Sequence, residues 1–238
     1  MTFHTIFKRI TSIAFSGILL LSAQTALALP NAYQADYSVA KGSMTLGNLH
    51  TSLKYSGNRY AYHKYTKATG IAALLTGIKI TERTDGQFSG QNIIPQSYFY
   101  NMSRHGKSRI DKVNFNQRKA AGSYDGTPYQ LNTPPNTQDR ASLEISLARD
   151  LSFNKKRLSY SVITHGEKTQ YNFQRIGNEK IKTPAGTFNT VKVKVIRSGS
   201  KRDTTFWMAK ELGFIPVKIN HREKDTVIIS VLKNYKKL

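Results

Sequence analysis

Apolar and polar side chains alternate along most of the chain. In the segments Tyr33–Val39, Val191–Ile196 and Ile215–Asn220, an apolar residue occupies every second position and the positions between are mainly polar. This period of two is typical of antiparallel strands that bury one face. The segment Val227–Leu232 is apolar on both faces, which predicts a more central strand.

Turn signals separate these segments at short intervals. Glycine stands beside a small, polar or otherwise turn-prone residue at Ser56-Gly57-Asn58, Asp85-Gly86, His105-Gly106, Asp125-Gly126, His165-Gly166 and Ile176-Gly177-Asn178. Many strands joined by short turns predict a meander, and the absence of a strand–helix–strand rhythm argues against a doubly wound nucleotide-binding fold. We therefore expect an all-β, mainly antiparallel fold: a curved sheet, open barrel or clam-like shape with one amphipathic helix.

That helix is predicted near Thr137–Leu151. Thr137 or Asn136 can cap it, and the two prolines just before them prevent an earlier start. Its apolar stripe consists of Leu143, Ile145, Leu147, Ala148 and Leu151. Arg140, Glu144 and Arg149 are expected largely on the outer side. We expect the helix to cover the open end or one face of the curved sheet.

A second apolar stretch, Gly70–Ile78, has two interpretations. It is rich in small residues and bracketed by glycines. The favoured interpretation is an ordinary buried strand or helical turn. The other is a mobile apolar lip over a ligand groove.

The first residues have the pattern of a secretory leader. A basic start with Lys8 and Arg9 precedes the apolar run Ile10–Leu21 and the small-residue signature Ala26-Leu27-Ala28. A membrane anchor is disfavoured because a bilayer-spanning helix needs about 20 apolar residues. We expect cleavage after Ala28, with Ala26 as the alternative, a single periplasmic β domain over residues 29–238, and no transmembrane segment in the mature chain.

Composition adds a strong basic charge. The chain of 238 residues carries a formal charge of +22, and the leader supplies only Lys8 and Arg9, which leaves +20. Such an excess favours anionic partners, and in the periplasm these are anionic lipid, lipopolysaccharide or wall polymer. No nucleic acid is expected in that compartment. The alternative is a generic solvated surface. The absence of cysteine excludes disulfides and thiolate metal sites.

The last third of the chain carries a recognisable set of motifs. These are the turn and strand Thr183–Val193, Phe206-Trp207-Met208-Ala209 and Ile215-Pro216-Val217-Lys218, with Asp139–Leu143 upstream. In this respect the chain resembles the exported bacterial family catalogued as "domain of unknown function 3108". The resemblance implies a mainly β periplasmic protein without assigned catalytic residues. By architecture alone the chain is also similar to curved-sheet lipoprotein carriers and envelope-integrity proteins.

The chain contains none of the common catalytic motifs. The five histidines after the leader have no metal-ligand spacing on one element; they are His50, His63, His105, His165 and His221. Ser142 follows Asp139 closely, and this pairing is more typical of a helix cap than of a nucleophile. Carboxylates are few and scattered, which argues against a glycosidase pair. We expect no enzyme activity, no catalytic residue, no metal site and no cofactor.

Two basic clusters are the candidate anion-binding residues. The first surrounds the Gly106 turn, and the second follows the predicted helix. They comprise Arg104, His105, Lys107, Arg109 and Lys112, and then Lys155, Lys156 and Arg157. Aromatic residues lie nearby in the sequence, and this combination suits amphiphile head groups or glycans.

These observations favour a non-enzymatic periplasmic protein that supports the cell envelope and binds an anionic amphiphile or wall polymer. A second hypothesis is a protein–protein interaction scaffold, and a less favoured third is a hydrolase of envelope material. A large apolar cavity would favour the first, a flat exposed apolar patch the second, and a buried histidine with a carboxylate in a cleft the third.

Overall fold

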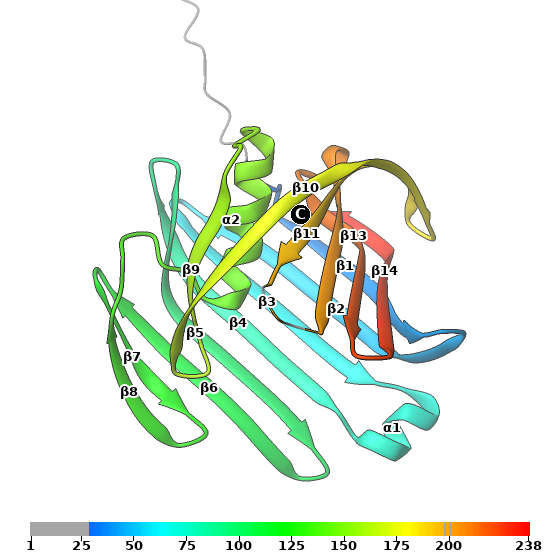
Figure 1. The fold of residues 1–238 in the computed structure, drawn as a ribbon, viewed down its shortest axis with the longest axis horizontal. Coiled ribbons are helices and arrows are strands. Elements are labelled where there is room, and N and C mark those ends of the chain that lie inside the picture. Colours follow the sequence, from blue (N-terminus) through cyan, green and yellow to red (C-terminus); the bar gives the residue numbers. More distant parts are fainter. Residues whose placement is uncertain (1–28, 198, 200) are drawn as a thin grey trace, which may run out of the picture.

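The fold is one antiparallel sheet of fourteen strands that curves around a helix (Figure 1). The computed structural model describes residues 29–197, 199 and 201–238, so the predicted leader and its cleavage site lie outside the described residues. None of the helices formed by these residues has the length and apolar character needed to cross a bilayer.

The strands fall into two runs in chain order. The first run is β1 (Tyr33–Lys41), β2 (Met44–Ser56), β3 (Arg59–Ala68), β4 (Lys79–Ser89), β5 (Asn92–Arg104), β6 (Lys107–Asn116), β7 (Lys119–Tyr124) and β8 (Thr127–Asn132). The second is β9 (Leu158–Thr164), β10 (Glu167–Thr183), β11 (Gly186–Ile196), β12 (Arg202–Ala209), β13 (Ile215–Glu223) and β14 (Thr226–Lys237). The helices are α1 (Gly70–Thr76), α2 (Arg140–Ser152) and the short 3-10 turn η1 (Lys210–Leu212).

The sheet order explains the shape. Within each run every strand pairs with its neighbour in the chain, and the pairing of β1 with β14 joins the two runs into one sheet. We call the run β1–β8 and the run β9–β14 the two limbs of this sheet. The outer strands β8 and β9 are the sheet's edges and do not pair with each other. The all-β prediction is confirmed, and the sheet stays open rather than closing into a barrel.

The predicted strand faces agree with the observed burial. Tyr33, Ala35 and Tyr37 of β1 are buried, as are the alternating valines of β11. β14 has strands on both sides, as predicted, but of its apolar residues from Val227 to Leu232 only Leu232 is buried. β14 therefore lies in the middle of the sheet, but its two faces are not both buried.

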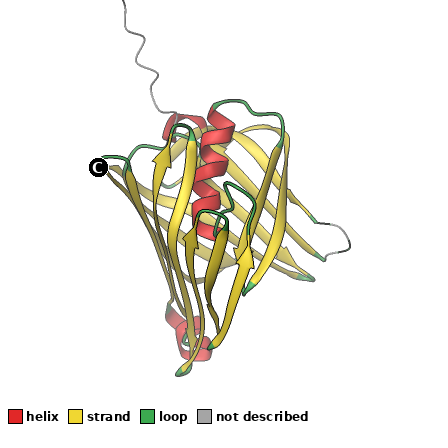
Figure 2. Cartoon of the chain, turned by 90° about the vertical axis from the view of Figure 1, so that its left-hand side faces the viewer, coloured by secondary structure: helices red, strands yellow, loops and turns green. Residues whose placement is uncertain are grey.

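Helix α2 lies inside the curve of the sheet, surrounded by strands of both limbs (Figure 2). The predicted helix is confirmed, but it begins later than expected. Asp139, not Thr137 or Asn136, is the cap, because its carboxylate accepts the backbone N–H groups of Ala141 and Ser142. The Thr137 hydroxyl instead donates to the Pro134 carbonyl oxygen at 2.8 Å.

The prediction of an outer polar side for this helix is wrong for Arg149. This side chain is buried, forms an ion pair with Asp150 and donates to the Gln91 carbonyl oxygen. Arg140 and Glu144 pair with Glu82 and Lys64, although 36% and 29% of their side chains remain exposed. The reason is that protein packs around both sides of α2, so part of its polar face is covered as well as its apolar stripe.

Helix α1 replaces the buried segment expected at residues 70–78. The helical turn is present, but Ala72 is its only buried residue, while Ile71, Leu74 and Leu75 are strongly exposed. The favoured interpretation of this stretch is therefore correct in conformation and wrong in burial. α1 lies at the end of the molecule away from α2 (Figure 2).

Candidate functional site

A cavity lies between α2 and the inner faces of both limbs. Its volume is about 740 Å³, within the usual range for ligand pockets of about 300–1,000 Å³. Leu143, Leu147 and Glu144 of α2 form its inner end. Exposed lining residues near the strand ends, among them Arg109, Thr169 and Glu223, mark its mouth. A ligand would therefore enter between the limbs and extend toward α2.

One part of the wall is apolar. Phe173 of β10 and Phe206 of β12 are half-buried, and their ring centroids are 6.3 Å apart. Buried aliphatic side chains of α2, β11 and β12 continue this surface; they are Leu143, Leu147, Val195 and Met208. An apolar chain placed here would remove this surface from water, which is favourable in proportion to the area covered.

Four arginines also line the cavity, and three of them have a carboxylate partner. Arg109 pairs with Asp125 at 3.6 Å, Arg140 with Glu82 at 3.9 Å and Arg202 with Glu223 at 2.8 Å.

Arg197 differs from the other three. It donates to the Thr204 hydroxyl at 3.2 Å, and none of the ion pairs found between described residues includes it. Its charge is therefore available to an anionic group inside the cavity.

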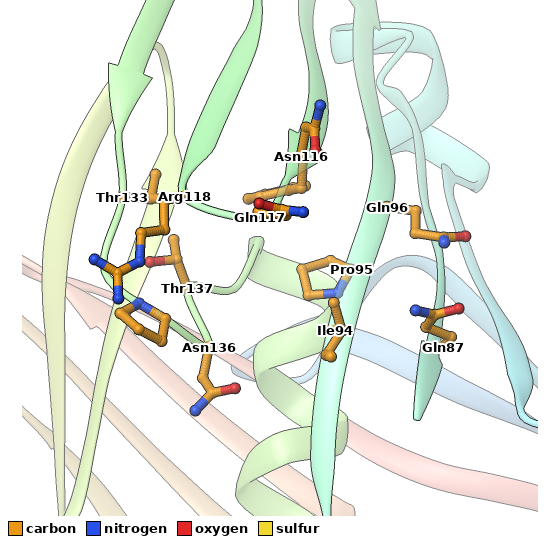
Figure 3. A pocket seen from close by; sticks show the side chains of 12 residues that line it. Gln87, Ile94, Pro95, Gln96, Asn116, Gln117, Arg118, Thr133, Asn136 and Thr137 are labelled. Carbon is orange, nitrogen blue, oxygen red and sulfur yellow. The ribbon is translucent and has the colours of Figure 1, made fainter. Parts of the chain in front are cut away.

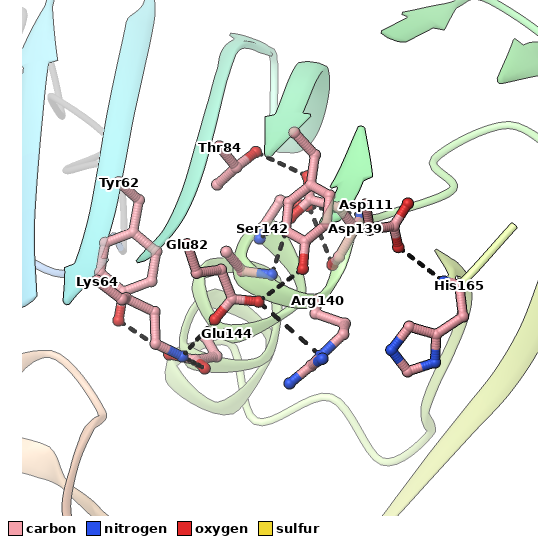
Figure 4. Close-up of polar contacts among 12 residues, drawn as sticks. Tyr62, Lys64, Glu82, Thr84, Asp111, Asp139, Arg140, Ser142, Glu144 and His165 are labelled. Atoms are coloured by element: carbon pink, nitrogen blue, oxygen red, sulfur yellow. Dashed lines mark hydrogen bonds and ion pairs between the residues drawn. The ribbon is translucent and has the colours of Figure 1, made fainter. Parts of the chain in front are cut away.

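A buried ion network supports the inner end of the cavity (Figure 4). Lys64 of β3 pairs with Glu144 and lies 3.3 Å from Glu82, which also accepts the Tyr98 hydroxyl at 2.8 Å. Burial alone would raise the pKa of Glu82, but Lys64 and Arg140 hold that pKa below its usual value. Burial alone would lower the pKa of Lys64, but Glu144 and Glu82 raise it. These groups therefore stay charged and fix α2 against the sheet.

Asp139 and Ser142 form a capping box, as their spacing suggested. The Ser142 hydroxyl accepts the Asp139 backbone N–H at 3.0 Å, and the Thr84 hydroxyl donates to the Asp139 carboxylate at 2.7 Å. Both residues are fully buried. Burial raises the pKa of Asp139 to about 6. Ser142 has a structural role and is out of reach of the cavity, so it is not a nucleophile there.

Two histidines line the cavity, His165 and His221. The backbone N–H of His165, not its ring, donates to Asp111 at 2.7 Å. The His221 ring contacts the Thr204 hydroxyl at 2.8 Å. Partial burial lowers the pKa of both rings, reinforced by Arg140 for His165 and by Arg197 for His221.

The histidine–carboxylate pair of a hydrolase therefore does not form in this cavity among the described residues. The His50 ring does contact Asp36 at 2.8 Å, but about half of each side chain is exposed on the sheet surface. In the part of the chain that the structure describes, no group of three histidine or acidic side chains could hold a metal ion.

The predicted anion-binding residues lie at opposite ends of the sheet. Arg104, His105 and Lys107 form the tip of the β5–β6 hairpin, where His105 and Gly106 both adopt positive φ angles, of 46° and 77°; such pairs are typical of two-residue hairpin turns. Lys155, Lys156 and Arg157 follow α2 at the other end, and Lys155 pairs with Asp150 at 3.0 Å.

Only one of the predicted residues reaches the cavity. Arg109 lines it, whereas Lys112 is exposed on the same strand and does not. The cavity residues that the sequence analysis missed include Arg197, Phe173 and Phe206. The alternation of apolar and polar residues in these strands could have indicated which face points inward. The meeting of these side chains in one cavity, however, depends on how the two limbs curve.

A second hollow of about 480 Å³ is lined by residues of β4, β5 and β6 and of the loops that follow β6 and β8 (Figure 3). It lies at the strand ends opposite those of Met102 and Arg109, which line the first cavity. Carboxamides dominate its polar lining: Gln87, Gln96, Asn116, Gln117 and Asn136. Among the described residues that line it, Arg118 alone is charged, and the apolar part consists of Ile94, Pro95, Phe115 and Pro135. This lining suits a polar, uncharged ligand better than an anionic amphiphile.

Comparisons with known proteins give a family and a fold. Residues 32–227 match the family described as "Protein of unknown function (DUF3108)". No curated protein matches the chain. A β-barrel-like protein of the domain of unknown function DUF1849 from Brucella abortus has a TM-score of 0.56 at 10% identity, covering 88% of this chain and 99% of that chain.

A protein from Parabacteroides distasonis described as a "putative lipoprotein" has a TM-score of 0.34 at 11% identity, covering 88% of this chain and 98% of that chain. At these identities the Brucella structure supports the fold alone, and the second likeness carries no argument. A function has to be inferred from the cavity itself.

Proposed function

The chain belongs to the DUF3108 family of unknown function, and we propose that it is a non-enzymatic binding protein whose cavity holds an anionic amphiphile. The apolar chain of the ligand lies against α2 and the two phenylalanines, and its anionic head group meets Arg197. Support comes from one observation: Arg197, which has no carboxylate partner among the described residues, lines the same cavity as a continuous apolar wall.

The dimensions and chemistry agree with this class of ligand. A volume of about 740 Å³ admits an acyl chain with a small head group. Placing an unpaired cation in a partly apolar cavity is costly unless an anion compensates it. Bound ligand would supply that anion, because Arg197 forms a charge-assisted hydrogen bond with a carboxylate or phosphate.

The proposed location is the periplasm, where the protein would support the envelope. The predicted leader with its Ala26-Leu27-Ala28 signature supports export. Anionic amphiphiles are abundant at the two membranes that face that compartment. A scaffold for protein partners is the competing hypothesis, and the exposed apolar surface of α1 is the feature that would serve it.

The test is to identify what the protein carries. The protein is purified from its own cell envelope without detergent, extracted with organic solvent and analysed by mass spectrometry. We expect a fatty acid or other anionic lipid at close to one molecule per chain. Extracts that match those of an unrelated basic protein purified in parallel would overturn the proposal.

Variants link the ligand to the cavity. Arg197→Gln and Phe206→Ala should each lower the affinity for a fluorescent fatty acid by about tenfold, since a charged hydrogen bond or a buried aromatic contact contributes that much. Arg222→Gln is the matched control, because Arg222 is exposed beside the cavity residue His221 and does not line the cavity. Equal affinities for all these variants and the wild type would contradict the assignment.

A further inference from the structure

Helix α1 exposes large apolar side chains to solvent. Ile71, Leu74 and Leu75 have exposed fractions of 67%, 81% and 69%, and Met44 on the neighbouring hairpin is 47% exposed. Single exposed apolar residues are common, but a contiguous group of large ones usually marks an interaction site. We call these four residues the lip.

The lip has a defined conformation. Ala72 is buried beneath α1, and the Thr69 backbone N–H donates to the Leu46 carbonyl oxygen at 3.0 Å. A ring nitrogen of His105 lies 3.1 Å from the Leu75 carbonyl oxygen. These contacts hold α1 against the ends of β2 and β5, so that its large aliphatic side chains point outward.

The segments around the lip are rich in cations. Lys67 pairs in register with Lys79, Lys79 with Ser103, and Arg104 with Lys107, which places these residues on adjacent strand ends. Lys41 lies opposite Met44 in the β1–β2 hairpin. The segments 41–46, 67–80 and 103–108 contain five lysines and arginines and no aspartate or glutamate.

All five cations are exposed and available to an external partner. They are Lys41, Lys67, Lys79, Arg104 and Lys107, and none of them takes part in an ion pair within the part of the chain described. A set of exposed cations around a projecting apolar helix is complementary to a surface that is apolar inside and anionic outside.

We propose that the lip docks the protein on an anionic lipid bilayer. Ile71, Leu74 and Leu75 enter the boundary between head groups and acyl chains, and the surrounding cations bind anionic head groups. The cavity mouth lies at the same strand ends, since Met102 and Arg109 pair there and both line the cavity. Docking would therefore turn the mouth toward the membrane.

This inference goes beyond the cavity's ligand, because the two surfaces use different residues. A cavity that carries no lipid would leave membrane docking intact, and a lip that fails to dock would leave ligand binding intact. The variant Arg197→Gln separates them: it should reduce fatty-acid binding while keeping vesicle binding at the wild-type level.

The first experiment measures insertion directly. Because the chain has no cysteine, Leu74→Cys introduces a single site for an environment-sensitive fluorophore. We expect its emission to rise and shift to the blue with vesicles of phosphatidylglycerol and phosphatidylethanolamine, but not with phosphatidylcholine alone. Asn58→Cys in the β2–β3 turn, roughly 40 Å away by strand length, is the control and should not respond. An unchanged emission at position 74 would overturn the proposal.

The second experiment separates the apolar from the ionic contribution by vesicle sedimentation. Leu74→Ser combined with Leu75→Ser, and Arg104→Ser combined with Lys107→Ser, should each reduce partitioning by about tenfold or more. Lys156→Ser with Arg157→Ser removes equal charge from exposed residues at the far end and should have little effect.

Two further outcomes decide between partners. Added salt should weaken docking steeply, because exposed charges are screened within about 8 Å at physiological ionic strength. If the lip charge variant and the far-end charge control lose vesicle binding equally, net charge alone drives binding and the proposal is wrong. If the protein instead self-associates through α1 in the absence of lipid and ignores vesicles, the lip is a protein interface and the proposal is equally wrong.

Discussion

Lys64 is the residue on which the inner end of the cavity depends most. Its ammonium group lies between Glu82 and Glu144, and only 16% of its side chain is exposed. Taking such charges out of water is costly, and the pairing compensates for that cost only while every partner is present. The same lysine connects strand β3 to helix α2, so one contact joins sheet and helix.

Replacing this lysine should therefore destabilise the protein strongly. Lys64→Met leaves two carboxylates without their common partner, and we expect a loss of about 3–5 kcal/mol in the free energy of unfolding. Urea denaturation measures it. Lys67→Met on the exposed face of the same strand is the control. Adding Glu144→Gln to Lys64→Met should recover part of the loss, and a wild-type midpoint for Lys64→Met would contradict this assignment.

The capping residue Asp139 gives a prediction for pH. Burial raises its pKa to about 6 in the folded protein, above the value of about 3.9 in an unfolded chain. The folded state therefore binds the proton more tightly, so the contribution of Asp139 is most favourable below about pH 4 and is lost as pH rises through about 6.

Asp139→Asn should remove this dependence while keeping the cap, because an asparagine oxygen can still accept the Ala141 and Ser142 N–H groups. As pH rises from 4 to 7, the free energy of unfolding of the variant should increase by roughly 2–3 kcal/mol relative to that of the wild type. Thermal unfolding across that range measures the difference. A constant difference between the two proteins would show that Asp139 does not titrate there.

At the residue scale the sequence was informative about local chemistry only. The spacing of Asp139 and Ser142 indicated a cap, since a capping box is defined within four consecutive residues. Nothing local distinguished Lys64 from its exposed neighbours, because its two partners are contributed by a different strand and by the helix. Arg149 was placed on the wrong side for the same reason.

At the level of elements, α2 determines what the sheet can enclose. Its stripe of Leu143, Leu147 and Leu151 packs with apolar residues of β9, β11 and β12 in one cluster. The helical period of that stripe was visible in the sequence, so existence and approximate bounds were predictable. The partial burial of its polar side was not predictable, since the second limb that covers it is assembled from distant strands.

Leu147→Asp tests the packing of this stripe. The side chain is 3% exposed, and burying an unpaired charge there should cost at least about 3 kcal/mol. Leu147→Met, which preserves volume and polarity, should cost less than about 1.5 kcal/mol. Melting temperatures followed by circular dichroism provide the comparison. If the aspartate variant melts like the wild type, the stripe faces solvent.

For helix α1 the sequence indicated the conformation but not the burial. Its apolar content favoured burial, because large aliphatic residues are usually inside. The structure exposes them, and both flanking strand ends are cationic. A local apolar run has the same signature whether it packs on the core or projects from it, and only the neighbouring strand ends distinguish the two.

At the scale of the whole molecule, the sheet is a meander folded back on itself. Every pairing joins strands adjacent in the chain except that of β1 with β14, so hairpin signals were enough to predict the general class. The β1–β14 pairing and the proximity of the two sheet edges, β8 and β9, depend on contacts between residues far apart in the chain. No periodic pattern in the sequence indicates such contacts. The cavity depends on both, which is why its lining was not predictable.

The two limbs meet where the β9–β10 turn reaches β6. The Asp111 carboxylate accepts the His165 backbone N–H at 2.7 Å, and the His165 ring lies 4.9 Å from the ring of Tyr124. Asp111 is buried, so this contact is protected from competing water. Since the edges β8 and β9 do not pair, this polar contact helps to hold the cavity closed on that side.

Asp111→Ala should loosen the contact without unfolding the sheet. A hydrogen bond to a charged group contributes about 1.5–3 kcal/mol, so backbone amides around His165 should exchange with deuterium at least about tenfold faster, while those of β12 and β13 keep their rates. The control is Asp125→Asn, which removes the charge that pairs with Arg109, keeps an oxygen for the Ile110 N–H and tolerates the positive φ of 48° in this turn. Uniformly faster exchange throughout the sheet would mean that Asp111 supports global stability instead. Unchanged exchange at His165 would mean that the limbs are held together by other contacts, and a bound amphiphile would then be the first candidate.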